Sequence, residues 1–263
     1  MKKYKHIWGL LVSAGVILSA CGGGDKKEIT ISTEESTMQQ SSMSDDVQEA
    51  VLDALFSECS YLTEEMFERA TAYQEGDLSR IAAAMRKAEA GEKVTVGVIG
   101  GSITQGSSAS GQDKSYAGYL KKWWEDTFPN AEIEFINAGV GATGSYLGVH
   151  RVEEDLLIYE PDFVVVEFSV NDNNSLFCKK SYDNLLRRIL KEENAPAVLL
   201  LFMTMEDGTS TQDNNAGIGF QYALPMISYK NAVLEEIADG NFTWKDISPD
   251  NIHPNDRGHT IAG

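Results

Sequence analysis

Ser102 is the residue in this sequence that is best placed to act as a nucleophile. It ends a Gly-Gly-Ser turn that directly follows an apolar run over residues 94–99. A serine hydroxyl is a weak nucleophile that needs a neighbouring base, and glycines let the backbone approach a bound molecule closely. A simple chain reversal or a phosphate-binding loop would also explain the turn. The glycine spacing, however, fits neither the dinucleotide-binding pattern nor the P-loop pattern.

The base that Ser102 requires is predicted at His253, three residues after Asp250. In a Ser-His-Asp arrangement the imidazole takes the serine proton, and the carboxylate fixes the imidazole tautomer and stabilises the imidazolium. An Asp-x-x-His spacing can supply both groups from one turn of chain. Of the other histidines, His150 lies in a predicted helix among charged residues and His259 lies in a predicted terminal helix. Both are expected to be structural or exposed.

Two further loops carry groups that could stabilise a developing oxyanion. A Gly-rich loop over residues 137–144 could present a backbone N–H, and Asn171 could present its side-chain amide. Taken alone, the Gly-rich loop is equally typical of a tight strand-to-helix connection. Asn and Asp are also common in turns. Neither loop is therefore specific by itself.

Short apolar runs and helical patterns alternate from residue 94 onward. We expect strands over residues 94–99, 133–137, 163–169 and 197–203, and helices near residues 116–128, 146–159, 182–193 and 222–238. The runs are rich in β-branched residues and almost continuously apolar, which is typical of a parallel sheet buried on both faces. The prediction is an α/β fold, a three-layer α/β/α sandwich around a parallel central sheet. Ser102 and Asn171 follow strands, and such loops gather at one sheet edge.

The combination of these motifs resembles the SGNH hydrolase (GDSL-like) family. The four sequence blocks of that family supply a nucleophilic Ser, an oxyanion Gly, an oxyanion Asn and a terminal Asp-x-x-His pair. All four are present here in that order, from about residue 94 to the end of the chain. The resemblance implies a flavodoxin-like fold and the hydrolysis of carboxylic esters. No metal or cofactor is expected, because the scattered histidines and cysteines give no ligand spacing.

The resemblance also implies a role for each matching residue. Ser102 would attack the ester carbonyl, His253 would pass the proton to the leaving alcohol, and Asp250 would orient the imidazole. The oxyanion would be bound by the Ser102 N–H, the Asn171 side chain and one N–H of the second loop. That N–H comes from Gly141 or, in another register, from Ala142.

The sequence departs from the family pattern at several points. The Gly-Asp-Ser motif of the family reads Gly-Gly-Ser here, and Ser169 stands where a glycine is expected ahead of Asn171. The sequence also stops shortly after His253, where the family continues into a helix that packs on the sheet. One expectation is therefore that the domain over residues 94–263 is truncated. None of these departures removes the Ser, Asp or His.

The N-terminus has the features of an export signal. Three lysines precede an apolar run over residues 7–18, which is too short to span a bilayer, and Leu-Ser-Ala-Cys follows. This stretch resembles the lipobox of bacterial lipoproteins, which would make residues 1–20 a cleaved signal peptide and Cys21 the lipidated residue. The alternative is an ordinary signal peptide with an incidental cysteine. We expect a lipoprotein of the cell membrane that faces the extracellular side.

Two segments connect this anchor to the predicted domain. Residues 21–44 are rich in Gly, Ser and Thr without apolar periodicity and are expected to form a flexible linker. Residues 45–93 are expected to form helices that pack on the catalytic domain, with Thr63 and Asp77 as helix N-caps and Gly91 as a helix stop. A disulfide between Cys59 and Cys178 is permitted by export but is not implied by two lone thiols.

The composition narrows the partners of the protein. The formal net charge is −18, and the sequence contains no basic stripe of the kind that binds nucleic acid.

The leading hypothesis is an esterase that deacetylates carbohydrate outside the cell. A lipase, lysophospholipase or thioesterase would need an extended apolar groove, for which residues 220–226 are the nearest candidate. A catalytically silent binding protein is a third hypothesis. Trp123 and Trp124 point in different directions on a helix, so at least one is expected in the core rather than on a sugar platform.

Overall fold

A parallel five-stranded sheet forms the centre of the structure, a computed structural model that describes residues 61–72 and 76–263. The predicted signal peptide, Cys21, the linker and Cys59 lie outside the described residues. The strand order is β2-β1-β3-β4-β5. The strands are β1 (Val94–Gly100), β2 (Ile133–Gly139), β3 (Phe163–Glu167), β4 (Ala197–Phe202) and β5 (Met226–Ser228). All four neighbouring pairs are parallel, as the sequence predicted.

The strands are apolar on both sides because each side is covered. Every residue of β1 and of β3 is buried. Along β1, Val96 and Val98 belong to one core cluster, whereas Ile99 belongs to the other. Since successive side chains of a strand point to opposite faces, a nearly continuous apolar run supplies two cores at once.

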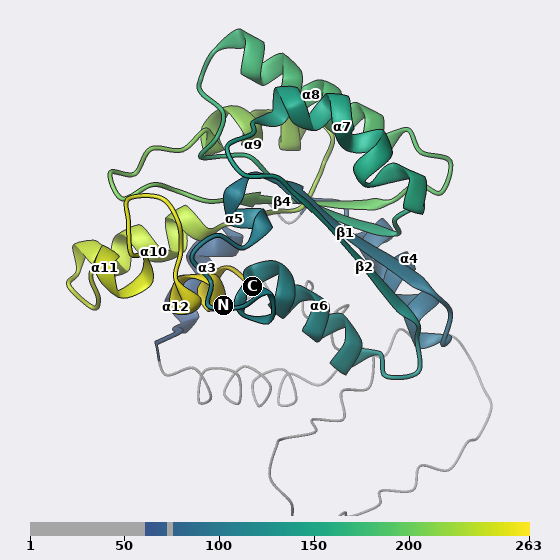
Figure 1. Ribbon diagram of the computed structural model, residues 1–263, viewed down its shortest axis with the longest axis horizontal. Coiled ribbons are helices and arrows are strands. Elements are labelled where there is room, and N and C mark those ends of the chain that lie inside the picture. Colours follow the sequence, from purple (N-terminus) through teal and green to yellow (C-terminus); the bar gives the residue numbers. More distant parts are fainter. Residues whose placement is uncertain (1–60, 73–75) are drawn as a thin grey trace, which may run out of the picture.

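Helices cover both faces of the sheet and complete the three layers (Figure 1). One face carries α7 (Ser145–Asp155), α8 (Leu176–Leu190) and α9 (Gln212–Gln221). The other carries α3 (Glu64–Thr71), α4 (Ser79–Glu89), α6 (Tyr116–Thr127), α10 (Tyr229–Ala238), α11 (Trp244–Ile247) and α12 (Asp256–Ala262). Three short helices lie in the connections: α5 (Ser102–Gln105), η1 (Gln112–Lys114) and η2 (Leu157–Tyr159).

The helices α3 and α4 share a hydrophobic core with the central sheet. Met66 of α3 and Met85 of α4 are buried in the same cluster as the valines of β1. The Thr63 hydroxyl accepts the Met66 N–H at 3.1 Å and so caps α3, and Gly91 has φ +74° just after α4. The prediction of Asp77 as an N-cap was wrong, because Leu78 occupies the N-cap position of α4. Within residues 61–72 and 76–263, no helix is both long enough and apolar enough to cross a bilayer.

The prediction of a single helix over residues 222–238 was wrong. The structure places β5 over its first half, and only the second half forms α10. A strand of three residues is too short to show alternation, and its apolar residues merge with the helical pattern that follows. The helix α9, which lies before β5, was not predicted. The helix α8 also begins at Leu176, ahead of the expected start at residue 182, because the Ser175 hydroxyl caps it.

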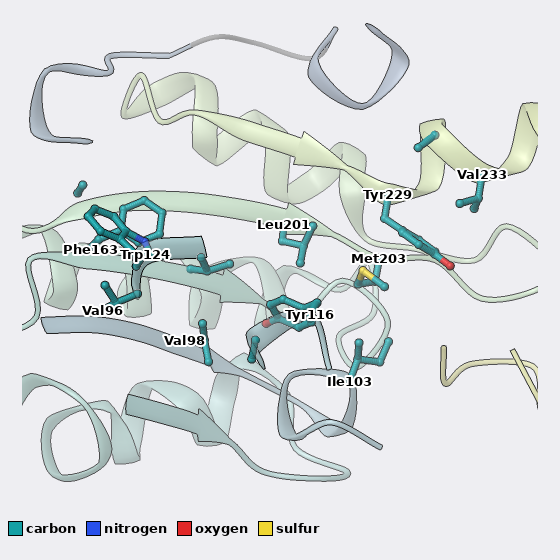
Figure 2. Close-up of a cluster of buried hydrophobic side chains, with 14 of the residues drawn as sticks. Val96, Val98, Ile103, Tyr116, Trp124, Phe163, Leu201, Met203, Tyr229 and Val233 are labelled. Atoms are coloured by element: carbon teal, nitrogen blue, oxygen red, sulfur yellow. The ribbon is translucent and has the colours of Figure 1, made fainter. Parts of the chain in front are cut away.

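The two adjacent tryptophans lie in different environments. The side chain of Trp124 is 1% exposed and packs on Phe163 of β3, as Figure 2 shows. Trp123 is 38% exposed and meets the Trp124 ring edge-on at 5.4 Å between centroids. Trp124 is therefore a core residue, and Trp123 covers it from the solvent side.

The two positions are expected to differ sharply in stability. Trp124→Ala removes a fully buried ring and should lower the free energy of unfolding by about 3–5 kcal/mol. Trp123→Ala is the matched control and should cost about 1–2 kcal/mol, since most of what it removes is two edge-on aromatic contacts, with Trp124 and Phe128. Urea denaturation followed by circular dichroism measures both values. Equal losses would show that Trp124 is not the core residue described here.

Candidate active site

Ser102 lies where the sheet opens between β1 and β3. It is the first residue of α5, directly after the carboxyl end of β1. The chain then leaves toward β2 on one side, whereas the next strand, β3, lies on the other side. Such a switch in strand order leaves a crevice at the carboxyl ends of the strands. The nucleophile candidate therefore stands in the position where this fold class builds its sites.

The backbone of Gly101 lies very close to the Asn171 side chain. A Cβ atom at Gly101 would lie 2.1 Å from Asn171 Oδ1, which is far inside van der Waals contact. A side chain at position 101 would therefore require the Asn171 amide to move from this position. The Gly-Gly-Ser turn brings the Ser102 backbone and the Asn171 side chain together.

His253 connects Ser102 to Asp250 through two hydrogen bonds. Ser102 Oγ lies 2.9 Å from His253 Nε2, and His253 Nδ1 lies 2.8 Å from Asp250 Oδ2. Because a carboxylate can only accept, the ring carries its proton on Nδ1 and donates it to Asp250. Nε2 is then free to accept the Ser102 hydroxyl proton. The two hydrogen bonds link the three side chains in a row, although Ser102 and His253 are 151 positions apart in the sequence.

Asp250 is also held by the backbone of its own turn. Its Oδ1 accepts the N–H groups of Ile252 and His253, each at 2.7 Å. Partial burial opposes ionisation, but these hydrogen bonds and the one from the His253 ring outweigh it and lower the pKa of Asp250. The ionised carboxylate is the form that can stabilise an imidazolium.

Neighbouring groups fix the position of this turn. The Trp244 ring N–H donates to the Asp250 carbonyl at 2.6 Å, and the Glu206 N–H donates to the Asn251 carbonyl at 3.0 Å. Glu206 lies in the loop that follows β4. The base is therefore anchored both to α11 and to the carboxyl edge of the sheet.

The residues predicted to donate hydrogen bonds to the oxyanion lie near Ser102. Asn171 Nδ2 makes no hydrogen bond to any residue of the described part, so it is available as a donor. A Cβ at Gly141 would lie 3.8 Å from Ser102 Cβ, which places this residue beside the serine. Its N–H donates to Gln105 Oε1 at 2.9 Å. Ala142 is exposed and has φ +59°.

Arg151 braces the ends of two strands, and sequence reasoning missed it. Its Nη1 donates to the Ala138 carbonyl at 2.7 Å and its Nη2 to the Gly100 carbonyl at 3.0 Å. It also pairs with Asp155 at 2.8 Å. In the sequence, Arg and Asp four residues apart on a helix indicate only a surface ion pair. The contacts with β1 and β2 become visible only when the fold is known.

Glu167 is a second residue that sequence reasoning missed. Its hydrogen bonds connect the segment after β1 to the loop after β3. Its carboxylate is fully buried at the end of β3. One oxygen accepts the N–H and O–H of Ser169 at 3.1 Å, and the other accepts the Thr104 hydroxyl at 3.5 Å. Thr104 belongs to α5, the short helix that begins at Ser102, and Ser169 belongs to the loop that carries Asn171. The signal in the sequence is the single carboxylate that ends a strand of apolar residues.

Burial also changes the charge of this group. Desolvation raises the pKa of Glu167 to about 7, against the opposing hydrogen bonds from Ser169, and the neighbouring Asp172 adds to the rise. A carboxylate without a cationic partner is disfavoured in such surroundings. Glu167 is thus half protonated near neutral pH.

His259 has a structural role rather than a chemical one. It is fully buried, and its Nδ1 accepts the Tyr116 N–H at 3.2 Å. Its Nε2–H therefore donates to the carbonyl of Ser107 at 3.2 Å, and Ser107 lies in the loop that follows α5. Burial lowers the pKa of His259, which keeps the ring neutral. His150 is exposed on α7.

The sequence profile of the GDSL-like Lipase/Acylhydrolase family matches residues 98–261. This chain belongs to that family. The matched region begins within β1 and includes Ser102, Asn171, Asp250 and His253. A search of curated proteins found no match.

Solved structures agree with this membership. The crystal structure of a two-domain esterase (CEX) active on acetylated mannans, co-crystallised with mannopentaose, is 40% identical, with a TM-score of 0.71. The match covers 72% of this chain and 52% of that one, so the chain spans about half the length of this relative. The acetyl xylan esterase AlAXEase (20% identity, TM-score 0.52, 63% and 94% covered) shares the fold. So does a catalytic mutant of Axe2, an acetylxylan esterase from Geobacillus stearothermophilus (18%, 0.53, 64% and 90%).

Glu167 should give this family member a measurable pH dependence of stability. Its pKa is raised on folding, so the native state binds more protons than the unfolded state, and stability falls as pH rises toward and through about 7. Glu167→Gln keeps the shape and the acceptor oxygen but cannot ionise. From pH 5 to pH 8, the wild type should lose about 2 kcal/mol relative to this variant.

Urea denaturation at several pH values measures this difference. Glu132→Gln, at an exposed position just before β2, is the control and should follow the wild-type profile. Parallel pH profiles for the wild type and Glu167→Gln would contradict the buried ionisation.

Proposed function

We propose that this protein is a serine carboxylic ester hydrolase that removes acetyl groups from carbohydrate. The observation that carries the proposal is the hydrogen-bonded chain from Ser102 through His253 to Asp250. The family membership favours acyl transfer to water as the reaction. A catalytically silent binding protein would have no use for a serine whose hydroxyl proton is already directed at a correctly oriented imidazole.

The reaction would proceed in two halves. Ser102 Oγ attacks the acetyl carbonyl while His253 Nε2 takes its proton, and the carbonyl oxygen becomes an oxyanion. Collapse of this intermediate breaks the bond to the sugar oxygen, which leaves with the proton from His253. Water then attacks the acetyl-enzyme with His253 as base, and acetate leaves as Ser102 recovers its proton. Asp250 stabilises the imidazolium in both halves.

The oxyanion would be held by three donors. These are the Ser102 N–H at the start of α5, the Asn171 side chain and the Gly141 N–H. We assign Gly141 rather than Ala142, because Gly141 is the residue beside Ser102 and its N–H is directed toward an acceptor. In the free enzyme that acceptor is Gln105 Oε1, so the exposed Gln105 side chain must yield when the oxyanion forms.

The carbohydrate substrate is inferred from the 40% identity to the esterase active on acetylated mannans. Ser102 lies at the carboxyl edge of the sheet, where an acetyl group that projects from a polymer could reach it. We also propose that the protein works on the outer side of the cell membrane, held by a lipid on Cys21. This location suits a polymeric substrate, and its support is the lipoprotein-like N-terminal sequence.

The triad roles are tested by hydrolysis of p-nitrophenyl acetate. Ser102→Ala should lower kcat/KM by at least about 10³-fold, and Asp250→Asn should lower it by about 10⁴-fold because the imidazole tautomer is lost. KM should change little in either variant. Activity with butyrate and longer esters should fall with chain length. Wild-type activity in Ser102→Ala, or a preference for long chains, would refute the serine mechanism or the acetyl preference, respectively.

Gly101 should control the oxyanion donor Asn171. Gly101→Ala places a methyl group on the amide and should lower kcat by about 10²-fold, as loss of one oxyanion donor does. Asn171→Ala should give a similar loss, and the double variant should lose little more, because both act on one donor. The control is Gly217→Ala on α9, where no atom lies within 4 Å of the new Cβ. If the kcat losses of the two single variants added up in the double variant, Gly101 would not act through Asn171.

A further inference from the structure

A groove runs between α7 and α8 on the outer face of the molecule. These helices lie side by side above the sheet (Figure 1). The hollow has a volume of about 580 Å³. Seven of its lining residues are aromatic or cationic: Tyr146, His150, Phe177, Lys180, Arg187, Arg188 and Lys191. None of these side chains takes part in the ester chemistry described above. We refer to this feature as the α7–α8 groove.

The aromatic end of the groove adjoins the active site. Tyr146 is the second residue of α7, and the preceding Ser145 N–H donates to Asp172 Oδ1 at 2.9 Å. Asp172 directly follows the oxyanion candidate Asn171. A polymer whose acetyl group reaches Ser102 can therefore continue over the first turn of α7 and into the groove.

Two aromatic rings are presented to solvent at this end. Tyr146 is 46% exposed and Phe177 is 58% exposed, and their ring centroids lie 5.0 Å apart. Exposed large apolar groups that gather beside a site are typical of a binding surface. The C–H faces of pyranose rings pack against such rings, whereas their hydroxyl groups remain in water.

The remainder of the groove is positively charged in an otherwise acidic protein. Its lining residues include four Lys and Arg side chains and no carboxylate, whereas the whole chain carries a net charge of −18. Asp183 pairs with Arg187 at 3.2 Å, and Glu153 pairs with Arg188 at 3.1 Å. Lys180 and Lys191 form no ion pair with any residue in the described ranges. Two ammonium groups are therefore left to attract an anionic ligand.

We propose that the α7–α8 groove binds the chain of an acidic polysaccharide. One sugar packs on Tyr146 and Phe177 next to the active site, and carboxylates further along the chain meet Lys180 and Lys191. From residue 177 to residue 191 the helix extends about 21 Å, which is long enough for several sugars. The inference rests on the proposed function and adds that the favoured acetylated polymer carries uronate-type charges. A neutral chain would use only the aromatic end.

Acetate release from two polymers tests the proposal with the full-length chain. O-acetylated polygalacturonate should have a lower KM than O-acetylated mannan, and the difference should shrink as salt rises from 50 to 500 mM, since salt screens such contacts. Lys180→Glu with Lys191→Glu should raise KM for the acidic polymer at least about tenfold and leave the mannan KM unchanged. Phe177→Ala should raise KM for both. All variants should hydrolyse p-nitrophenyl acetate at the wild-type rate.

The control reverses two charges on the opposite face of the sheet, with Lys121→Glu and Lys122→Glu on α6, and should leave every KM unchanged. Equal KM values for both polymers in the wild type and the groove variant would overturn the proposal. So would binding of the full-length chain to phosphatidylglycerol vesicles that the same two lysine substitutions abolish, because the groove would then face a lipid surface. Failure of the proposed function is distinct, since it appears as hydrolysis of the small ester that does not need Ser102.

Discussion

The level ends of β1 and β3 are the constraint on which the rest of the site depends. In the parallel register Gly100 lies beside Glu167, so the two strands stop together. The loop with Ser102 and the loop with Asn171 therefore leave the sheet side by side, and Gly101 lets them touch. If β3 moved by one residue, its side chains would exchange faces, and the two apolar cores would no longer match. The packing of the sheet thus sets the distance between nucleophile and oxyanion donor.

A buried polar network secures this junction at an electrostatic cost. Glu167 holds Thr104 and Ser169, and Tyr116 extends the network by its contact with Thr104 at 2.8 Å. Ser169, where the family has a glycine, accepts the Met203 N–H at 2.7 Å and so joins β4 to the same network. A buried carboxylate destabilises the fold when it is ionised, but its hydrogen bonds are directional and select one arrangement of the loops. The buried carboxylate therefore lowers the stability of the fold while it fixes the geometry of the loops.

The sequence was sufficient for the sheet and for the residues that lie together at its edge, but not for the groups that position them. The strands β1 to β4 carry runs of apolar residues that satisfy two cores, and Ser102, Asn171 and His253 follow features with a local spacing. By contrast, Arg151 and Glu167 act on segments far away in the chain, so no local pattern announces them. The choice between Gly141 and Ala142 depends on the path of a loop. The strand β5 was missed because three residues carry too little periodicity.

The turn from Asp250 to His253 contains its own internal restraints. The carboxylate bonds to the ring and to two backbone N–H groups of the same four residues, whereas only one hydrogen bond leads from the ring to Ser102. The relative orientation of His253 and Asp250 is therefore fixed within their own turn, and the rest of the chain places this turn beside Ser102. The residues of the site therefore come from two separate parts of the chain, the turn from Asp250 to His253 and the segment at Ser102. Helices and loops between the two parts can therefore differ in length and sequence, provided that this turn reaches the same edge of the sheet.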